Sequence, residues 1–166
     1  MNRRQRAGRL ADVSELPHPQ ATWARFVAAI LREMDDENVE RVRNAYAAWA
    51  VRDMDAAAAD WDPEIEWDLT HWDEVPPGTR AVGIPQVMAL IAEWMATWRA
   101  YEITVESYEA IGENVLLMVR RRARERDTGA SADRVAPQLW TFRDGRVVRI
   151  ASYTDVEEAR RAAGLS

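Results

Sequence analysis

The sequence contains no cysteine and no lysine among its 166 residues. The missing cysteine excludes disulfide bonds, thiolate nucleophiles and cysteine-ligated metals. The missing lysine excludes Schiff-base chemistry. Histidine occurs only at His18 and His71, so a metal site built from several histidines is not expected. No nucleotide-binding motif is present either, and we therefore expect neither a cofactor nor a bound metal.

Long hydrophobic runs are also absent, and no stretch approaches the roughly 18–20 apolar residues of a membrane helix. The basic residues 1–6 are not followed by the apolar segment of a secretory signal. We therefore expect a bacterial cytoplasmic protein that does not bind membranes. The net charge is −6, and residues 34–166 hold sixteen arginines against twenty-five acids. Because nucleic-acid binding requires a positive surface, this acidic body predicts no nucleic-acid partner.

The composition, 48% hydrophobic and 30% charged, is that of a folded soluble protein. Residues 1–33 predict an N-terminal extension, with a polar arm up to residue 20 and one amphipathic helix over 21–32. Met34, followed by two aspartates, resembles a new beginning and is a possible translation start. Residues 34–166 then predict one domain of ordinary size.

Within this domain, apolar spacing predicts helices over residues 37–51, 54–61 and 85–98. Asp35 or Asp36 is the expected cap of the first. Strict alternation over 64–70 predicts a half-buried strand, with Ile65 and Trp67 on its apolar face. Four further strands are expected over 101–109, 115–126, 135–142 and 146–154, followed by a short helix over 156–163 capped by Asp155.

The order of these elements resembles the nuclear transport factor 2-like superfamily, in its SnoaL-like and ketosteroid-isomerase-like branch. The segments that carry the resemblance are 37–39, 45–49, 52–56, 62–67, 83–84 and 140–150. It implies an α+β fold in which a cone-shaped, curved antiparallel sheet wraps around the N-terminal helices. It also implies a deep apolar cavity for a small hydrophobic molecule, and we expect a homodimer formed through the sheet. Because such a fold hosts isomerases, cyclases, dehydratases and plain binding proteins, it does not decide the activity.

The resemblance also suggests catalytic residues. Asp68 matches the general base of the ketosteroid isomerases, and partial burial would raise its pKa toward neutrality. Gln138 matches the acid of their oxyanion hole, and Tyr46 falls one residue from their tyrosine. The alternative for Asp68 is a solvated residue at the end of a strand, paired with Arg80.

Three other arrangements involve Asp68 or its neighbours in the predicted cavity. An imidazole titrates near neutral pH, so His71 and Asp68 could form an acid/base pair; the alternative is a histidine in an exposed loop. The chemistry of the limonene epoxide hydrolases is excluded, because their second acidic position is Ser152 here. No specific spacing supports a metal site from Asp68, Asp73 and Glu74.

Eight tryptophans are many for this length. Five fall on predicted inward stripes: Trp49, Trp67, Trp94, Trp98 and Trp140. Together with Ile150 and Ser152 of the last strand, they predict an aromatic-lined pocket for a flat or cyclic hydrophobic ligand. The alternative is that most of them only fill the core.

A cluster of arginines occupies the second of the four C-terminal strands. Alternation puts Arg120, Arg122, Arg124 and Arg126 on one face, opposite the acids Glu102, Glu106 and Glu109 of the preceding strand. Cross-strand ion pairs are the expected arrangement. Arg121 points to the other face, where it can reach the cavity and orient an acidic substrate.

Two functions therefore remain open. The first is a cofactor-independent isomerase or cyclase that moves a proton next to a carbonyl, with Asp68 as base and Gln138 and Tyr46 at the oxyanion. The second is a non-catalytic ligand-binding or dimerisation domain of the same fold.

Overall fold

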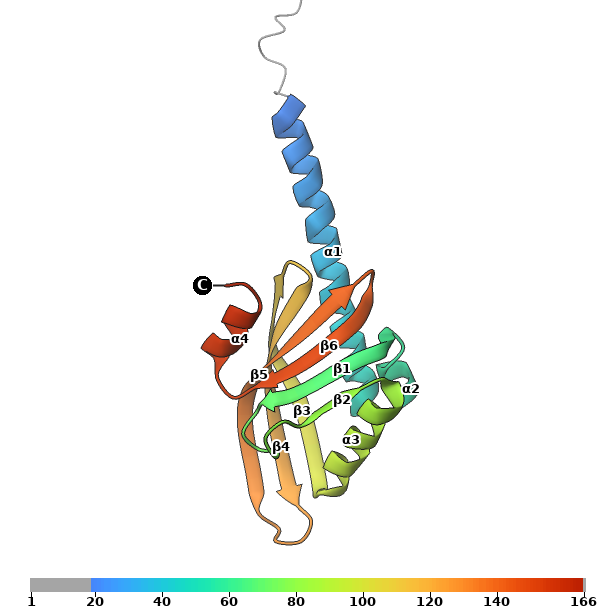
Figure 1. Ribbon diagram of the computed structural model, residues 1–166, viewed down its shortest axis with the longest axis vertical. Helices are drawn as coiled ribbons and strands as arrows, with labels where there is room; N and C mark the ends of the chain where they lie inside the picture. The colour runs from blue at the N-terminus through green and yellow to red at the C-terminus, as the bar shows by residue number, and fades with distance from the viewer. Residues whose placement is uncertain (1–18, 166) are drawn as a thin grey trace, which may run out of the picture.

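The computed structural model describes residues 19–165. The element order is that of an α+β fold (Figure 1). The elements are α1 (Pro19–Ala50), α2 (Met54–Ala57), β1 (Trp61–His71), β2 (Arg80–Val82), α3 (Ile84–Ala96), β3 (Trp98–Ile111), β4 (Asn114–Glu125), β5 (Ser131–Arg143), β6 (Arg146–Tyr153) and α4 (Val156–Ala162).

All six strands form one sheet in the order β2-β1-β6-β5-β4-β3. The four C-terminal strands make the expected antiparallel meander, and β1 then pairs with β6 in parallel. The turn between β5 and β6 is formed by Asp144 and Gly145, which have φ angles of 51° and 75°. Such angles are typical of a two-residue hairpin turn. The short edge strand β2 follows the predicted Pro-rich loop and was not expected.

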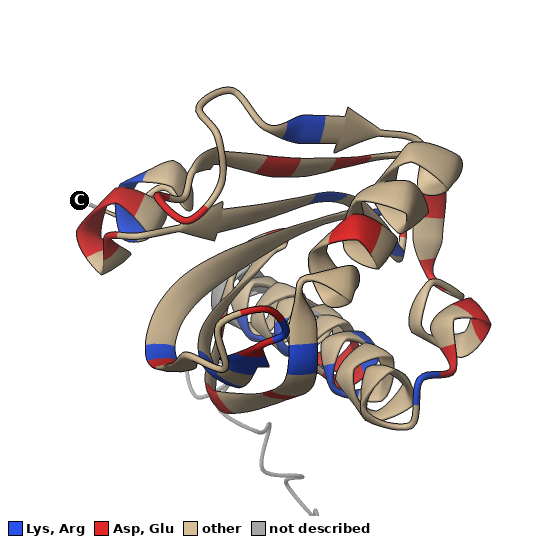
Figure 2. Ribbon diagram, turned by 90° about the horizontal axis from the view of Figure 1, so that it is seen from below, with Lys and Arg blue, Asp and Glu red and all other residues tan. Residues whose placement is uncertain are grey.

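The sheet bends on itself, with helices at its open side (Figures 1 and 2). Its concave face holds the main core, in which Val42 of α1 and Val87 and Ile91 of α3 meet the inward residues of the strands. The convex face carries a second, smaller core that Ala159 of α4 and Ala163 complete. This arrangement confirms the curved sheet wrapped around helices that the sequence predicts.

Helix α1 runs without interruption from Pro19 to Ala50, so the expected start of a separate helix near Asp35 was wrong. The sequence contains no glycine or proline between residues 20 and 62. An aspartate inside a helix costs well under about 1 kcal/mol relative to alanine, which does not end one. The N-terminal half projects beyond the sheet (Figure 1), and Trp23 and Phe26 are 66% and 55% exposed. The polar arm expected before residue 19 lies outside the described residues.

The short elements differ from prediction mainly at their ends. Helix α2 stops at Ala57 rather than at residue 61, because Trp61 already belongs to β1. Asp155 caps α4 as predicted, since its side chain accepts hydrogen bonds from the backbone N–H groups of Glu157 and Glu158. Within residues 19–165, no helix has the length and apolar character needed to cross a membrane.

Candidate functional site

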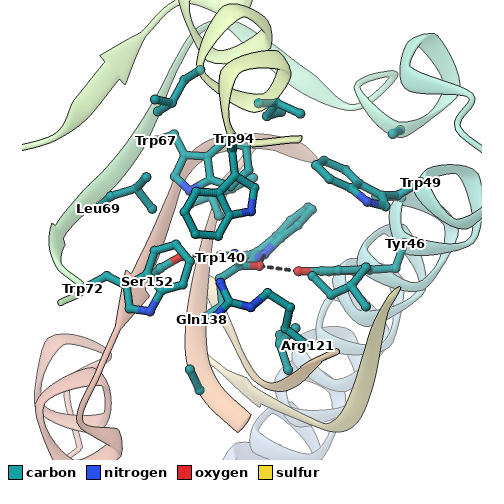
Figure 3. Close-up of a pocket in the computed structure, with 18 of the residues that line it drawn as sticks. Tyr46, Trp49, Trp67, Leu69, Trp72, Trp94, Arg121, Gln138, Trp140 and Ser152 are labelled. Carbon is teal, nitrogen blue, oxygen red and sulfur yellow. Dashed lines mark hydrogen bonds between the residues drawn. The ribbon is translucent and has the colours of Figure 1, made fainter. Parts of the chain in front are cut away.

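A pocket of about 100 Å³ lies between the concave face of the sheet and helices α1 and α3 (Figure 3). Most of its wall is apolar, and aromatic rings from helices and strands face one another across it. The lining residues are Ala45, Tyr46, Trp49, Ala57, Trp61, Trp67, Leu69, Trp72, Leu90, Ile91, Trp94, Tyr101, Ile103, Val119, Arg121, Arg134, Ala136, Pro137, Gln138, Trp140, Ile150 and Ser152.

One chain of hydrogen bonds crosses this apolar wall. The Gln138 side-chain oxygen accepts from the Tyr46 hydroxyl at 2.5 Å and from Trp140 Nε1 at 2.6 Å. Because an indole nitrogen can only donate, the amide oxygen must face Trp140. The amide nitrogen therefore points the other way and donates to Ser152 Oγ at 3.3 Å. The structure thus brings Tyr46 and Gln138, two of the predicted site residues, into direct contact in the pocket (Figure 3).

The environment of Tyr46 determines what its hydroxyl can do. Burial raises the pKa of Tyr46 far above its ordinary value, and the neighbouring Tyr101 and Tyr108 raise it further. The phenol is therefore neutral at every physiological pH. It acts as a hydrogen-bonding group and not as a base, and its oxygen lone pairs remain able to accept from a ligand.

Arg121 is the buried charge of the pocket, with 6% of its surface exposed. Its Nη2 forms an ion pair with Glu74. Its guanidinium carbon lies 5.2–5.3 Å from the ring centroids of Trp72, Trp94 and Trp98, within the range of cation–π attraction. Arg121 thus lines the pocket, and its guanidinium lies in an aromatic cage formed by those three indoles.

A second arginine on the neighbouring strand also lines the pocket. Arg134 of β5 is the register partner of Arg121 of β4. Its Nη1 contacts Glu74 Oε1 at 2.8 Å and Asp73 Oδ1 at 2.7 Å. Glu74 is therefore shared between the two arginines. Arg134 was not predicted as a pocket residue, because the expected strand began at residue 135 whereas β5 begins at Ser131.

Asp68 lies on the opposite face of β1 from the pocket. Trp67 and Leu69 line the cavity, whereas Asp68 accepts hydrogen bonds from the Thr70 backbone N–H and hydroxyl and from Arg149. Burial alone would raise the pKa of Asp68, but the bonds from Thr70 and Arg149 outweigh it and hold the pKa below its usual value. The expected rise in pKa was therefore wrong.

The predicted partners of Asp68 also differ. Arg80 pairs with Glu66 instead. His71 is the last residue of β1 and does not lie in a loop. Its Nδ1 lies 2.6 Å from Glu158 of α4, and its ring stacks on Tyr153 with centroids 4.9 Å apart. The structure therefore does not bring His71 and Asp68 together as an acid/base pair.

The predicted pocket residues are largely found in the lining. Trp49, Trp67, Trp94, Trp140, Ile150 and Ser152 all belong to it. Trp98 lies behind this layer, where its ring packs on Trp94 with centroids 5.3 Å apart. Trp61 and Trp72 were missed. Both occur where the alternation of β1 begins or ends, so periodicity gave no indication of their direction.

The outward arginines form the expected cross-strand ion pairs only in part. Arg126 donates instead to the backbone carbonyl oxygens of Ala96 and Trp98, and Glu109 pairs with Arg160 of α4. Arg120 contacts Glu106 on β3 at 2.5 Å and Asp133 on β5 at 2.8 Å. Arg122, on the same face, lies 3.6 Å from Asp133. Among the side chains that the structure describes, in residues 22–34 and 37–165, no group of three histidine, aspartate or glutamate residues is placed to hold a metal ion.

The curved six-stranded sheet closed by helices is the fold of the nuclear transport factor 2-like α+β proteins. The family model of the SnoaL-like domain matches residues 42–150, and the chain belongs to that family. A search of curated proteins found no match.

Solved structures of the same fold include an NTF2-like protein of unknown function from Burkholderia pseudomallei, with 23% identity and a TM-score of 0.63 over 75% of this chain and 95% of that one. A putative SnoaL-like polyketide cyclase from Jannaschia sp. CCS1 has 21% identity and a TM-score of 0.63 over 79% and 94%. TerC, co-crystallised with polyporic acid, has 19% identity and a TM-score of 0.63 over 77% and 98%. At these identities the likeness establishes the fold.

Proposed function

We propose that this protein binds a small, largely apolar molecule in the aromatic pocket and fixes one polar group of it against the Tyr46–Gln138–Ser152 chain. The single observation that carries the proposal is this chain of oriented hydrogen bonds within an otherwise apolar wall. A few placed polar groups in an apolar cavity are typical of small-molecule sites.

The volume limits the ligand. A cavity needs roughly 10–15 Å³ to hold one water, so about 100 Å³ has room for a ligand of on the order of ten non-hydrogen atoms. That is one ring with short substituents. A flat ring also suits the tryptophan faces, since aromatic pairs prefer offset or edge-to-face contact.

The pocket favours binding over proton abstraction. No aspartate, glutamate or histidine is among its lining residues, and the phenol of Tyr46 stays protonated. Asp68 would have to reach the substrate from the far face of β1. The isomerase or cyclase therefore ranks second, and in it the Gln138 amide N–H would stabilise an oxyanion. TerC, a protein of the same fold, was co-crystallised with polyporic acid, but the proposal rests on the residues of this chain.

Acetophenone tests the proposal, because it has one ring, one carbonyl and nine non-hydrogen atoms. Saturable quenching of tryptophan fluorescence, confirmed by calorimetry, is expected for the wild-type protein. Gln138→Leu should weaken binding several-fold. Thr141→Val is the matched control, since the Thr141 side chain bonds Asn114 at 2.8 Å and does not line the pocket. Equal affinity in Gln138→Leu and wild type, or no saturable binding at all, would refute the proposal.

The same ketone separates the two functions. Proton transfer next to its carbonyl exchanges the methyl hydrogens for deuterium in D₂O, which NMR detects. We expect binding without accelerated exchange. Exchange that is accelerated by the wild-type protein and lost in Asp68→Asn would establish the enzyme and Asp68 as its base.

A further inference from the structure

The charged residues of the pocket wall are all of one sign. Among the lining residues only Arg121 and Arg134 are charged, and they are direct register partners on β4 and β5. Their acidic partners Asp73 and Glu74 are not part of the lining. We infer that the pocket is built for an anion, namely a single-ring aromatic carboxylate whose acid group binds Arg121. This inference rests on the proposed function and specifies its ligand class.

Arg121 retains hydrogen-bonding capacity inside the pocket. Its Nη2 is used by Glu74, whereas Nε and Nη1 are buried and have no hydrogen-bond partner among the described residues. A buried donor of a charged group without a partner is strongly unfavourable, and a carboxylate oxygen is its best acceptor. Glu74 does not fully neutralise Arg121, because its carboxylate is shared with Arg134.

The other unpartnered groups of the pocket are of the same kind. Among the described side chains of residues 22–34 and 37–165, every buried polar atom without a partner is an N–H donor. Four of them are indole nitrogens of lining residues: Trp49, Trp61, Trp67 and Trp72. These four indole N–H groups add to the unpartnered donors of Arg121. A complementary ligand supplies acceptors and negative charge, as an ionised carboxylate does with its two oxygens.

The aromatic cage holds Arg121 in place before any ligand arrives. Trp72 and Trp94 pack with ring centroids 5.1 Å apart, and Trp94 and Trp98 with centroids 5.3 Å apart. With the guanidinium fixed among these rings, little side-chain entropy is lost on binding. Figure 3 shows the Arg121 side chain extending toward the side of the pocket on which Trp72 lies.

Two anchoring points fix the orientation of the ligand. Arg134 and Gln138 are four residues apart on β5, about 13 Å along the strand. Long arginine side chains cover part of that span. A ring carrying a carboxylate at one end and a carbonyl at the other fills the remainder, with the acid at the arginines and the carbonyl at the amide N–H of Gln138.

The probes are 4-acetylbenzoate and 4-acetylbenzamide, which share the ring and the ketone and differ by one charge. Calorimetry on the full chain at pH 7.5 is expected to show at least about tenfold tighter binding of the acid, or about 1.4 kcal/mol. Arg121→Gln should abolish this preference and leave the affinity for the amide nearly unchanged. Arg122→Gln is the matched control, since it removes the same charge from the opposite face of β4 and should keep the preference.

Equal affinities for acid and amide in the wild-type protein overturn the inference, as does a preference that survives in folded Arg121→Gln. Should Arg121→Gln not fold by circular dichroism, Arg134→Gln decides. That replacement removes one positive charge and leaves Glu74 to neutralise Arg121, so the preference for the acid over the amide must fall several-fold. An undiminished preference refutes the inference. If acetophenone binds and the acid does not, only this inference fails. If neither binds, the proposed function fails with it.

Discussion

The hydrogen bond between Tyr46 and Gln138 predicts that the effect of Tyr46→Phe on stability depends on the residue at position 138. Tyr46→Phe in the wild-type background removes one donor from the Gln138 oxygen, which still accepts from Trp140. In the Gln138→Leu background the phenol has already lost its acceptor. Removing the hydroxyl should therefore destabilise the first protein and leave the second unchanged or slightly more stable.

The magnitudes follow from the partners that each change leaves behind. Tyr46→Phe loses one neutral hydrogen bond and should cost about 0.5–1.5 kcal/mol. Gln138→Leu loses that bond too and leaves Trp140 Nε1 without an acceptor in a residue that is only 4% exposed. An unsatisfied buried donor costs about 1–3 kcal/mol, so Gln138→Leu should cost about 1.5–4.5 kcal/mol in all. The expected coupling between the two sites is about 1 kcal/mol.

Urea unfolding followed by far-ultraviolet circular dichroism measures the free energy of unfolding without relying on the mutated tryptophan environment. The four proteins of the cycle are compared at one temperature and pH. The same loss from Tyr46→Phe in both backgrounds would show that the hydroxyl does not act through Gln138. The oriented chain in the pocket would then be refuted.

Three further outcomes are expected. Asp68→Asn should lower the free energy of unfolding at neutral pH, because a carboxyl whose folded-state pKa is depressed stabilises the fold above its ordinary pKa of 3.8. The difference from wild type should vanish as pH falls through the folded-state pKa, which urea titrations at several pH values measure. Acetophenone binding should be unchanged in this variant. Asp155→Ala should lower the melting temperature by about 2–4 °C, because a lost N-cap costs about 1 kcal/mol; an unchanged melting curve would refute the cap. Amide hydrogen exchange should be faster over residues 23–34 of α1 than around the fully buried Val42, and uniform protection along the helix would contradict the structure.

The fold could be predicted well because the periodic spacing of apolar residues in helices and strands is local and recurs along the chain. Alternation over residues 115–126 placed Arg121 opposite Arg120 and Arg122, and the structure agrees. The same rule placed Asp68 opposite Trp67. The resemblance to the isomerases suggested a role that required Asp68 to face the cavity, and here alternation gave the correct answer.

The contents of the pocket were harder to predict, since they depend on contacts between distant strands. The partnership of Arg121 with Arg134 is set by the register of β4 and β5, which a single sequence does not reveal. The contact between Arg121 and Trp72 similarly joins residues 49 positions apart. The continuous helix α1 was missed for the opposite reason: two aspartates suggested a cap where nothing in the chain breaks the helix.

The parallel pairing of β1 with β6 has a consequence for synthesis on the ribosome. Trp67 lies beside Ile150, so the partner of β1 emerges more than eighty residues later. The hairpins of β3 to β6 close through short turns. Strand β1 pairs with β6 only after β6 has been synthesised, and its pocket-facing tryptophans stay exposed until then. A nascent chain that stops before residue 146 therefore carries most of the lining of the pocket but cannot close it, and its open strand edge is the part most at risk of aggregation.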